Sequence, residues 1–174
     1  MKVIVVSGAR SKVGKTQLSR GLCRLLPGAV RVKIGHHAWK PGHDPHLYPM
    51  GTRFSTIARD HSFARFLIIE SNRILEEITP ECTIYLPGEK PKPSAEMAMK
   101  KADIIRGEAL PASKIALLAA RLGCDETVIR AIAELSQSLP NFPSTKGPED
   151  KESSQAQRGW DDAGFIQGRA ASRS

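Results

Sequence analysis

A run of β-branched residues near the start of the chain leads directly into a small, basic turn. Residues 3–7 read Val-Ile-Val-Val-Ser and residues 8–16 read Gly-Ala-Arg-Ser-Lys-Val-Gly-Lys-Thr. Small residues let successive backbone N–H groups converge on phosphate oxygens, and the following helix points its positive end at the same charge. These residue types at this spacing predict a phosphate-binding loop.

The residues of this predicted loop have distinct roles in phosphate chemistry. Lys15 would reach the β- and γ-phosphates and stabilise charge that develops there, whereas Thr16 would bind Mg²⁺. Gly14 and the neighbouring amides would cradle the phosphates. The predicted nucleotide-binding residues are Gly8, Arg10, Ser11, Lys12, Val13, Gly14, Lys15, Thr16 and Gln17.

The usual pattern, G-x-x-x-x-G-K-[ST], has its first glycine where this chain has Ala9, and Gly8 stands one residue earlier. The flanking residues nevertheless fit, because an apolar strand precedes the loop and an amphipathic helix with Leu18 and Leu22 follows it. The alternative is a simple strand-to-helix turn with an exposed lysine.

Strand and helix patterns alternate through the first two thirds of the chain. This alternation predicts βαβ units, and hence an α/β fold with a mainly parallel sheet in the three-layer, Rossmann-like arrangement of P-loop NTPases. The ligand loops would lie at the carboxyl ends of the strands. We expect strands at 3–7, 30–34, 66–70, 83–86 and 103–106, and helices at 15–26, 53–59 and 95–101.

Glu70 follows the apolar residues 66–69, so a carboxylate is expected at the carboxyl end of a central strand. Parallel-sheet nucleotide enzymes place an acid near Mg²⁺ at this position. Glu70 and Lys15 are therefore the candidate catalytic residues. The alternative for Glu70 is an ordinary acidic residue at the start of a loop.

Four of the five histidines fall within the long segment 35–51: His36, His37, His43 and His46. A loop of this length between regular elements is often functional. A loop that faces substrate or phosphate is the preferred interpretation. A solvated loop and a transition-metal site are alternatives, the latter less favoured because metal ligands need fixed geometry.

Arg10 stands five residues before Lys15. In one branch of phosphate-loop ATPases a lysine at that offset reaches the nucleotide of a dimer partner, so Arg10 could act in trans in a homodimer. A solvated loop arginine is the simpler alternative.

The residues after Pro111 form a new pattern, with helices expected at 113–122 and 125–135 on either side of Gly123. The spacing is that of a helix-turn-helix, but Asp125 and Glu126 occupy the start of the second helix, where a DNA-reading helix presents basic and amide side chains. Packing or dimerisation is therefore favoured, and nucleotide-regulated DNA binding is the alternative.

Three parts are expected along the chain: a phosphate-loop domain at 1–109, a helical hairpin at 110–139 and a disordered tail at 140–174, where polar residues, Pro and Gly dominate. The net charge is +8, and the five basic and five acidic residues of 141–174 cancel, so the excess lies in the first 140 residues. A basic folded domain suits an anionic ligand.

The three cysteines are far apart and form no C-x-x-C pair, which predicts neither a disulfide framework nor a cysteine zinc site. No signal peptide and no membrane-spanning run is seen. A cytoplasmic protein is expected, without membrane or nucleic-acid partners.

Together these motifs resemble the MobB family, the phosphate-loop adaptors of molybdopterin-guanine dinucleotide biosynthesis. Besides the loop at 8–16, residues 32–37 (Val-Lys-Ile-Gly-His-His) resemble the family's Lys-His-x-His-His strand end. Residues 40–45 (Lys-Pro-Gly-His-Asp-Pro) resemble its Gly-Lys-Asp-Ser loop, Gly51-Thr52 its Ala-Gly-Ala segment, and Ile68-Ile69-Glu70-Ser71 the strand that ends in Glu-Gly. The resemblance covers residues 1–107.

The resemblance implies GTP binding with Mg²⁺, slow GTP hydrolysis and association with molybdenum cofactor biosynthesis proteins and their pterin cofactor. With this reading we expect a metal site of Thr16, Asp44 and Glu70, in which Thr16 and Asp44 hold Mg²⁺ directly or through water and Glu70 orders the metal's waters or the attacking water. From the residues alone the base is undecided between guanine and adenine. A small-molecule kinase and a metallocentre-assembly ATPase on the same fold are therefore alternatives.

Overall fold

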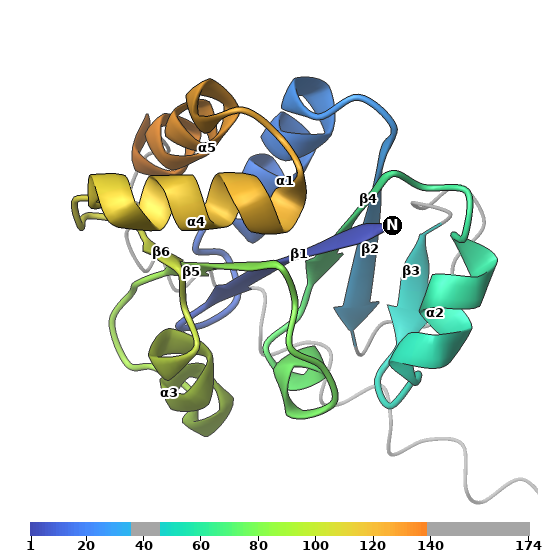
Figure 1. Cartoon of the computed structure of the whole chain (residues 1–174). Coiled ribbons are helices and arrows are strands. Elements are labelled where there is room, and N and C mark those ends of the chain that lie inside the picture. The colour runs from blue at the N-terminus through green and yellow to red at the C-terminus, as the bar shows by residue number, and fades with distance from the viewer. Residues whose placement is uncertain (36–45, 139–174) are drawn as a thin grey trace, which may run out of the picture. The chain divides into compact units, whose positions relative to one another are not determined.

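A computed structural model describes residues 1–35 and 46–138 (Figure 1). Their strands form a single sheet in the order β3-β2-β4-β1-β5-β6, and all neighbouring strands run parallel. The expected α/β class and parallel sheet are therefore confirmed. The strands are β1 (Lys2–Gly8), β2 (Ala29–Gly35), β3 (Leu47–Pro49), β4 (Phe66–Glu70), β5 (Cys82–Leu86) and β6 (Ile104–Ile105).

Helices cover both faces of this sheet and give three layers (Figure 1). One face packs against α1 (Lys15–Leu25), α4 (Ala112–Leu122) and α5 (Glu126–Ser138). The other packs against α2 (Phe54–Asp60), the 3-10 helix η1 (Arg73–Glu76) and α3 (Pro93–Lys100).

The central strands β4 and β5 are buried along their whole length, and β1 is buried from Val3 onward. Successive side chains point to opposite faces of a strand, so Ile4 and Val6 join the core beneath α1 while Val3 and Val5 join the core beneath α3. Burial on both faces explains why these strands are continuous apolar runs.

Two elements, β3 and η1, had no counterpart among the sequence-based predictions. β3 is only three residues long and ends in proline, so its sequence carries no strand period. The expected strand at 103–106 shortens to two residues, although the amides of Asp103 and Arg106 still donate to the Thr83 and Tyr85 carbonyls of β5. The Thr83 amide donates to the Asp103 carboxylate at 2.8 Å, so a side chain and not a backbone carbonyl is its acceptor at this end of β6.

The helical pair predicted as a hairpin beside the phosphate-loop domain shares that domain's core. Ile115 and Leu118 of α4 and Ile129 and Ile132 of α5 lie in the same buried cluster as Ile4 of β1. The predicted tail at 140–174 lies outside the described residues. Within the described ranges, no helix is long and apolar enough to span a membrane.

Candidate functional site

The segment that connects β1 to α1 contains the predicted phosphate loop. Its start is held by Asn72, which lies between β4 and η1. Asn72 Nδ2 donates to the Gly8 carbonyl at 2.9 Å, and the Gly8 amide donates to Asn72 Oδ1 at 3.0 Å. A side-chain amide thus pairs with the backbone where β1 ends. Asn72 was not among the predicted site residues, although it follows Glu70 by two residues.

The steric requirement for glycine falls on Gly8 and not on position 9. A Cβ at Gly8 would lie 2.7 Å from Val13 Cγ2 and 3.0 Å from the Leu86 carbonyl oxygen. Ala9, in contrast, is fully buried without strain: its amide donates to Leu86 O, and its carbonyl accepts from the Lys92 amide, both at 3.0 Å. The one-residue offset from the usual motif therefore has a structural cause.

The loop reaches α1 through two residues with positive φ. Lys12 has φ +65° and Gly14, the residue before α1, has φ +98°. Such alternations turn successive amides toward one side of a loop, which is how backbone anion sites are made. Across the loop, Lys15 Nζ donates to the Arg10 carbonyl at 2.6 Å.

Glu70 lies at the end of β4, as predicted, and its carboxylate faces the first turn of α1. Thr16 Oγ1 donates to Glu70 Oε2 at 2.8 Å, and Ser19 Oγ donates to Glu70 Oε1. The hydroxyl predicted to bind Mg²⁺ and the predicted acid are therefore in direct contact. Ser19 was not among the predicted site residues, although it follows Thr16 by one helical turn.

The same carboxylate forms a buried ion pair with Arg31 of β2. Arg31 Nη1 lies 3.0 Å from Glu70 Oε1, and the two side chains are only 15% and 1% exposed. A buried carboxylate needs such a partner because desolvation of an unpaired charge is costly. No local sequence pattern indicates this pairing, since Arg31 and Glu70 belong to separate strands.

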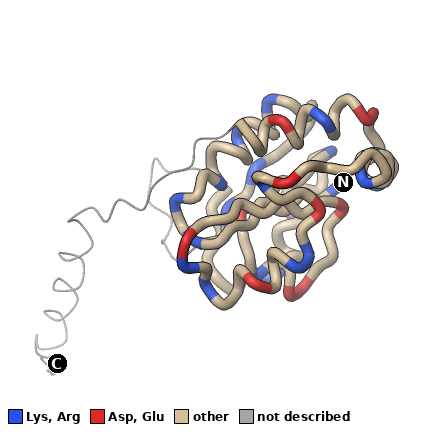
Figure 2. The backbone as a smooth tube through the Cα atoms, turned by 90° about the vertical axis from the view of Figure 1, so that its left-hand side faces the viewer, with Lys and Arg blue, Asp and Glu red and all other residues tan. Residues whose placement is uncertain are grey.

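Several ammonium groups surround the loop. Burial lowers the pKa of Lys15 to about 8, Glu70 opposes this shift, and the positive charges of Lys33 and Lys92 add to it. Lysines from α1, from β2 and from the β5–α3 connection thus act on one region. Figure 2 shows other Lys and Arg residues distributed along the described backbone.

The loop is also supported from the β6 side. Arg106 donates to the Pro87 carbonyl at 3.1 Å and to the Val13 carbonyl at 3.4 Å. Burial lowers the pKa of its guanidinium. A Cβ at Gly88 would lie 3.1 Å from Val13 Cγ1, so the β5–α3 connection packs closely on the loop.

The structure brings most of the predicted residues together, but some lie outside the described ranges. Residues 8–17 form one continuous segment, in which Ser11, Lys12 and Gln17 are exposed. The predicted ligand Asp44 and the histidines His36, His37 and His43 lie outside the described ranges.

His46 lies away from this loop, beside the end of α2. Its ring is 4.9 Å from that of His61, whose Nε2 is 3.1 Å from the Tyr48 hydroxyl. Burial lowers the pKa of His61. Among residues 1–35 and 46–138, no group of three His, Cys, Asp or Glu side chains is placed to hold a metal ion.

The side-chain oxygens beside the loop are suitable ligands for a hard divalent cation whose other ligands come from a bound phosphate. Mg²⁺ prefers oxygen ligands, keeps several waters and is commonly held by one or two protein oxygens together with substrate phosphates. The Thr16 hydroxyl and the Glu70 carboxylate supply oxygens of this kind.

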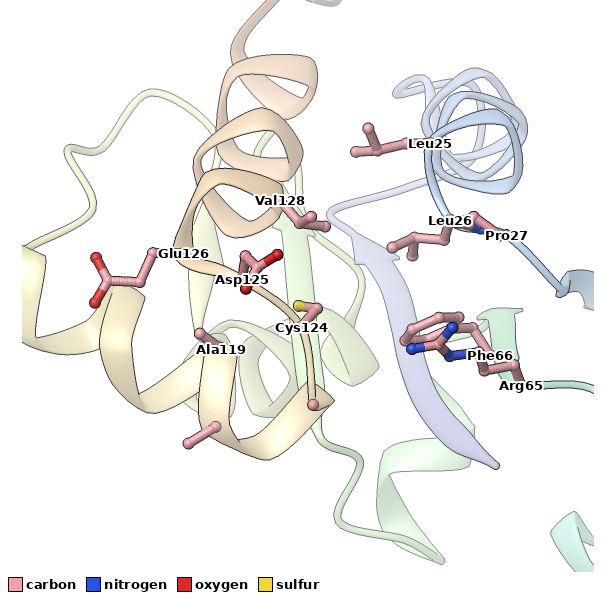
Figure 3. A pocket seen from close by; sticks show the side chains of 12 residues that line it. Leu25, Leu26, Pro27, Arg65, Phe66, Ala119, Cys124, Asp125, Glu126 and Val128 are labelled. Carbon is pink, nitrogen blue, oxygen red and sulfur yellow. The ribbon is translucent and has the colours of Figure 1, made fainter.

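A hollow of about 690 Å³ lies at the amino ends of the strands, opposite the ends that carry the loop (Figure 3). Its walls come from the end of α1, the start of β4 and the α4–α5 turn. The apolar lining includes Leu25, Phe66 and Val128. Burial raises the pKa of the Cys124 thiol there, which disfavours the reactive thiolate.

Comparison with known proteins gave no identification. No family model, curated protein or solved structure matches this chain significantly. The resemblance to MobB proteins therefore stays a prediction.

Proposed function

We propose that this protein binds a purine nucleoside triphosphate, GTP in preference to ATP, together with Mg²⁺ at residues 8–17, and hydrolyses it slowly. The observation that carries the proposal is the 2.8 Å hydrogen bond between Thr16 and Glu70. It joins the residue after the loop lysine to an acid at the end of the strand beside β1, the pairing that phosphate-loop NTPases use around Mg²⁺.

The residues of the site have complementary tasks in this proposal. The ammonium of Lys15 stabilises charge on the β- and γ-phosphates, and backbone amides of 11–15 bind phosphate oxygens. Thr16 and Glu70 hold or orient the cation's ligands, and Asp44 is the further proposed ligand. Bound Mg²⁺ would supply charge neutralisation between the phosphates. Arg31 and Ser19 keep the Glu70 carboxylate oriented.

The biological role proposed on the MobB resemblance is assistance in assembly or delivery of the molybdenum cofactor. A homodimer and a cytoplasmic location belong to the same proposal, and Arg10 is the residue that would act on the partner's nucleotide. The cofactor-biosynthesis proteins and their pterin cofactor are the proposed partners.

Calorimetric titration with GTP and with ATP, each with Mg²⁺, tests the nucleotide site. Lys15→Ala should weaken binding at least about thirtyfold, since a hydrogen bond to a charged group contributes about 1.5–3 kcal/mol and a phosphate charge also loses its counter-charge. Lys100→Ala, an exposed lysine on α3, is the matched control and should bind as the wild type does. Equal affinities in all three proteins would refute the site.

The metal part of the proposal has its own test. Thr16→Val keeps the side-chain shape but removes the hydroxyl, so nucleotide binding should lose most of its dependence on Mg²⁺. Thr127→Val on the exposed start of α5 is the control. A Thr16→Val variant with full Mg²⁺ dependence would remove Thr16 from the metal site.

A small-molecule kinase is a second candidate, favoured by one observation. A smaller hollow of about 320 Å³ lies near the carboxyl ends of β2 and β4, where Ser71, Arg73 and Thr52 contribute to its walls. A phosphate acceptor would bind there, at the ends of the same strands but on the face of the sheet opposite the Glu70 carboxylate. A phosphorylated product distinct from inorganic phosphate would favour this function over simple hydrolysis.

A further inference from the structure

Strand β2 presents two cations on the face of the sheet that α1 covers. Arg31 is on this face because it contacts Glu70, whose other partners belong to α1. Alternate residues of a strand share a face, so Lys33 is on it too. Val32, between them, is buried in the core of the opposite face. Lys33 is also the register neighbour of Glu70.

The two cations differ in what neutralises them. Arg31 is paired with Glu70, whose Oε1 also accepts the Ser19 hydroxyl and whose Oε2 accepts Thr16. Within the described ranges no carboxylate forms an ion pair with Lys33, and its side chain is exposed. Lys33 therefore adds a positive charge that Glu70 does not cancel.

A second lysine approaches from the other side of β1. Lys92 is held there because its amide donates to the Ala9 carbonyl at 3.0 Å. The positive charges of both Lys33 and Lys92 act on Lys15. The strand order β2-β4-β1-β5 places Lys33 on the Glu70 side of the loop, whereas Lys92 precedes α3, after β5.

From this arrangement we propose that Lys33 binds the terminal phosphate of the nucleotide and makes the site selective for triphosphates over diphosphates. The inference rests on the function proposed above. In phosphate-loop NTPases the metal and its acid lie between the β- and γ-phosphates, so the Glu70 side of the loop is the side of the terminal phosphate. Lys92 lies on the other side and serves diphosphates and triphosphates alike.

The test compares GDP with a non-hydrolysable GTP analogue, each with Mg²⁺, by calorimetric titration. Lys33→Met keeps the length of the side chain and removes its charge. It should weaken analogue binding about 10- to 100-fold and change GDP binding less than about twofold, the range expected when one charged hydrogen bond is lost. Lys33→Arg keeps the charge and should retain most of the preference for the analogue.

Lys92→Met is the matched control, and it should weaken both nucleotides by the same factor. The proposal is overturned if Lys33→Met weakens GDP and the analogue equally, or if it weakens neither. Failure of the proposed function would look different. In that case the wild-type protein would bind neither GDP nor the GTP analogue, and neither ADP nor an ATP analogue titrated in parallel.

Discussion

The carboxyl ends of the parallel strands and their amino ends, here called the carboxyl edge and the amino edge of the sheet, differ in how their polar groups are arranged. At the carboxyl edge, Gly8, Thr16 and Glu70 are fixed by side-chain hydrogen bonds, and ammonium groups approach from three chain segments. At the amino edge, the hollow of about 690 Å³ is larger than the hollow of about 320 Å³ near the carboxyl ends of β2 and β4. It opens between α1 and the α4–α5 turn (Figure 3), and apolar side chains such as Leu25 and Val128 share its lining with Arg65, Asp125 and Glu126.

This difference shows why the size of a hollow is a poor guide to chemistry here. A binding site needs a few polar groups that converge and are held in place by other contacts. The carboxyl edge has that property, because the Glu70 carboxylate contacts Thr16, Ser19 and Arg31 at once.

The largest expected difference between the two edges concerns their arginines. Arg31→Met should lower the free energy of unfolding by about 3–5 kcal/mol, since it leaves the Glu70 carboxylate buried without its partner. Arg65→Met, at the exposed rim of the hollow, should change it by less than about 1 kcal/mol, the range of the exposed cation–π contact that Arg65 makes with the Phe66 ring. Urea denaturation measures both.

The double variant Arg31→Met/Glu70→Gln serves as the control for that prediction. It removes both charges and should recover much of the lost stability. If Arg31→Met and Arg65→Met cost the same, the buried ion pair does not distinguish the two edges.

The glycines of the two edges should also respond differently. Gly8→Ala should cost about 1–3 kcal/mol and weaken nucleotide binding, because its Cβ would overlap Val13 and approach Leu86 O. Gly123→Ala, in the α4–α5 turn, meets no atom within 4 Å and should cost only the strain of its φ of +64°, about 1–2 kcal/mol. Nucleotide titration separates them, because Gly123→Ala should bind as the wild type does; weakened binding by this variant alone would contradict the assignment.

A smaller effect is expected from pH. The Lys15 ammonium has a pKa of about 8 in the free protein, and a bound phosphate favours its charged form. Nucleotide affinity should therefore be constant below pH 7 and fall about tenfold between pH 7 and 9, as free Lys15 loses its proton. Lys15→Ala should remove this decline, whereas a decline of equal size in that variant would assign it to another group.

The smallest effect is expected in the hollow itself. Val128→Ala changes only its apolar lining and should alter nucleotide affinity less than about twofold. A tenfold change measured by calorimetry would show that the two edges are coupled.

Much of the fold was predictable because local patterns encode it. The apolar runs that became β1, β4 and β5 are long enough to indicate buried strands, and their alternation with helices indicates a parallel sheet. β3 was missed because this outermost strand has only three residues, which gain their structure from pairing with β2 and carry no period of their own.

The candidate site was predictable only where its residues lie in one segment or end a strand. Lys15, Thr16 and Glu70 met these conditions. Arg31 and Asn72 did not, because their roles depend on the strand order, which places β4 between β1 and β2. Pairings between separate strands are set by tertiary packing, which no local pattern records.

The central claim is that ligand binds at the carboxyl edge and not in the larger hollow. The most direct test is nitrogen-15 NMR of the wild-type protein during titration with GTP and Mg²⁺. The account predicts large shifts of the Gly8, Gly14 and Lys15 amides and none at Gly123 and Cys124. Shifts confined to Gly123 and Cys124 would contradict it.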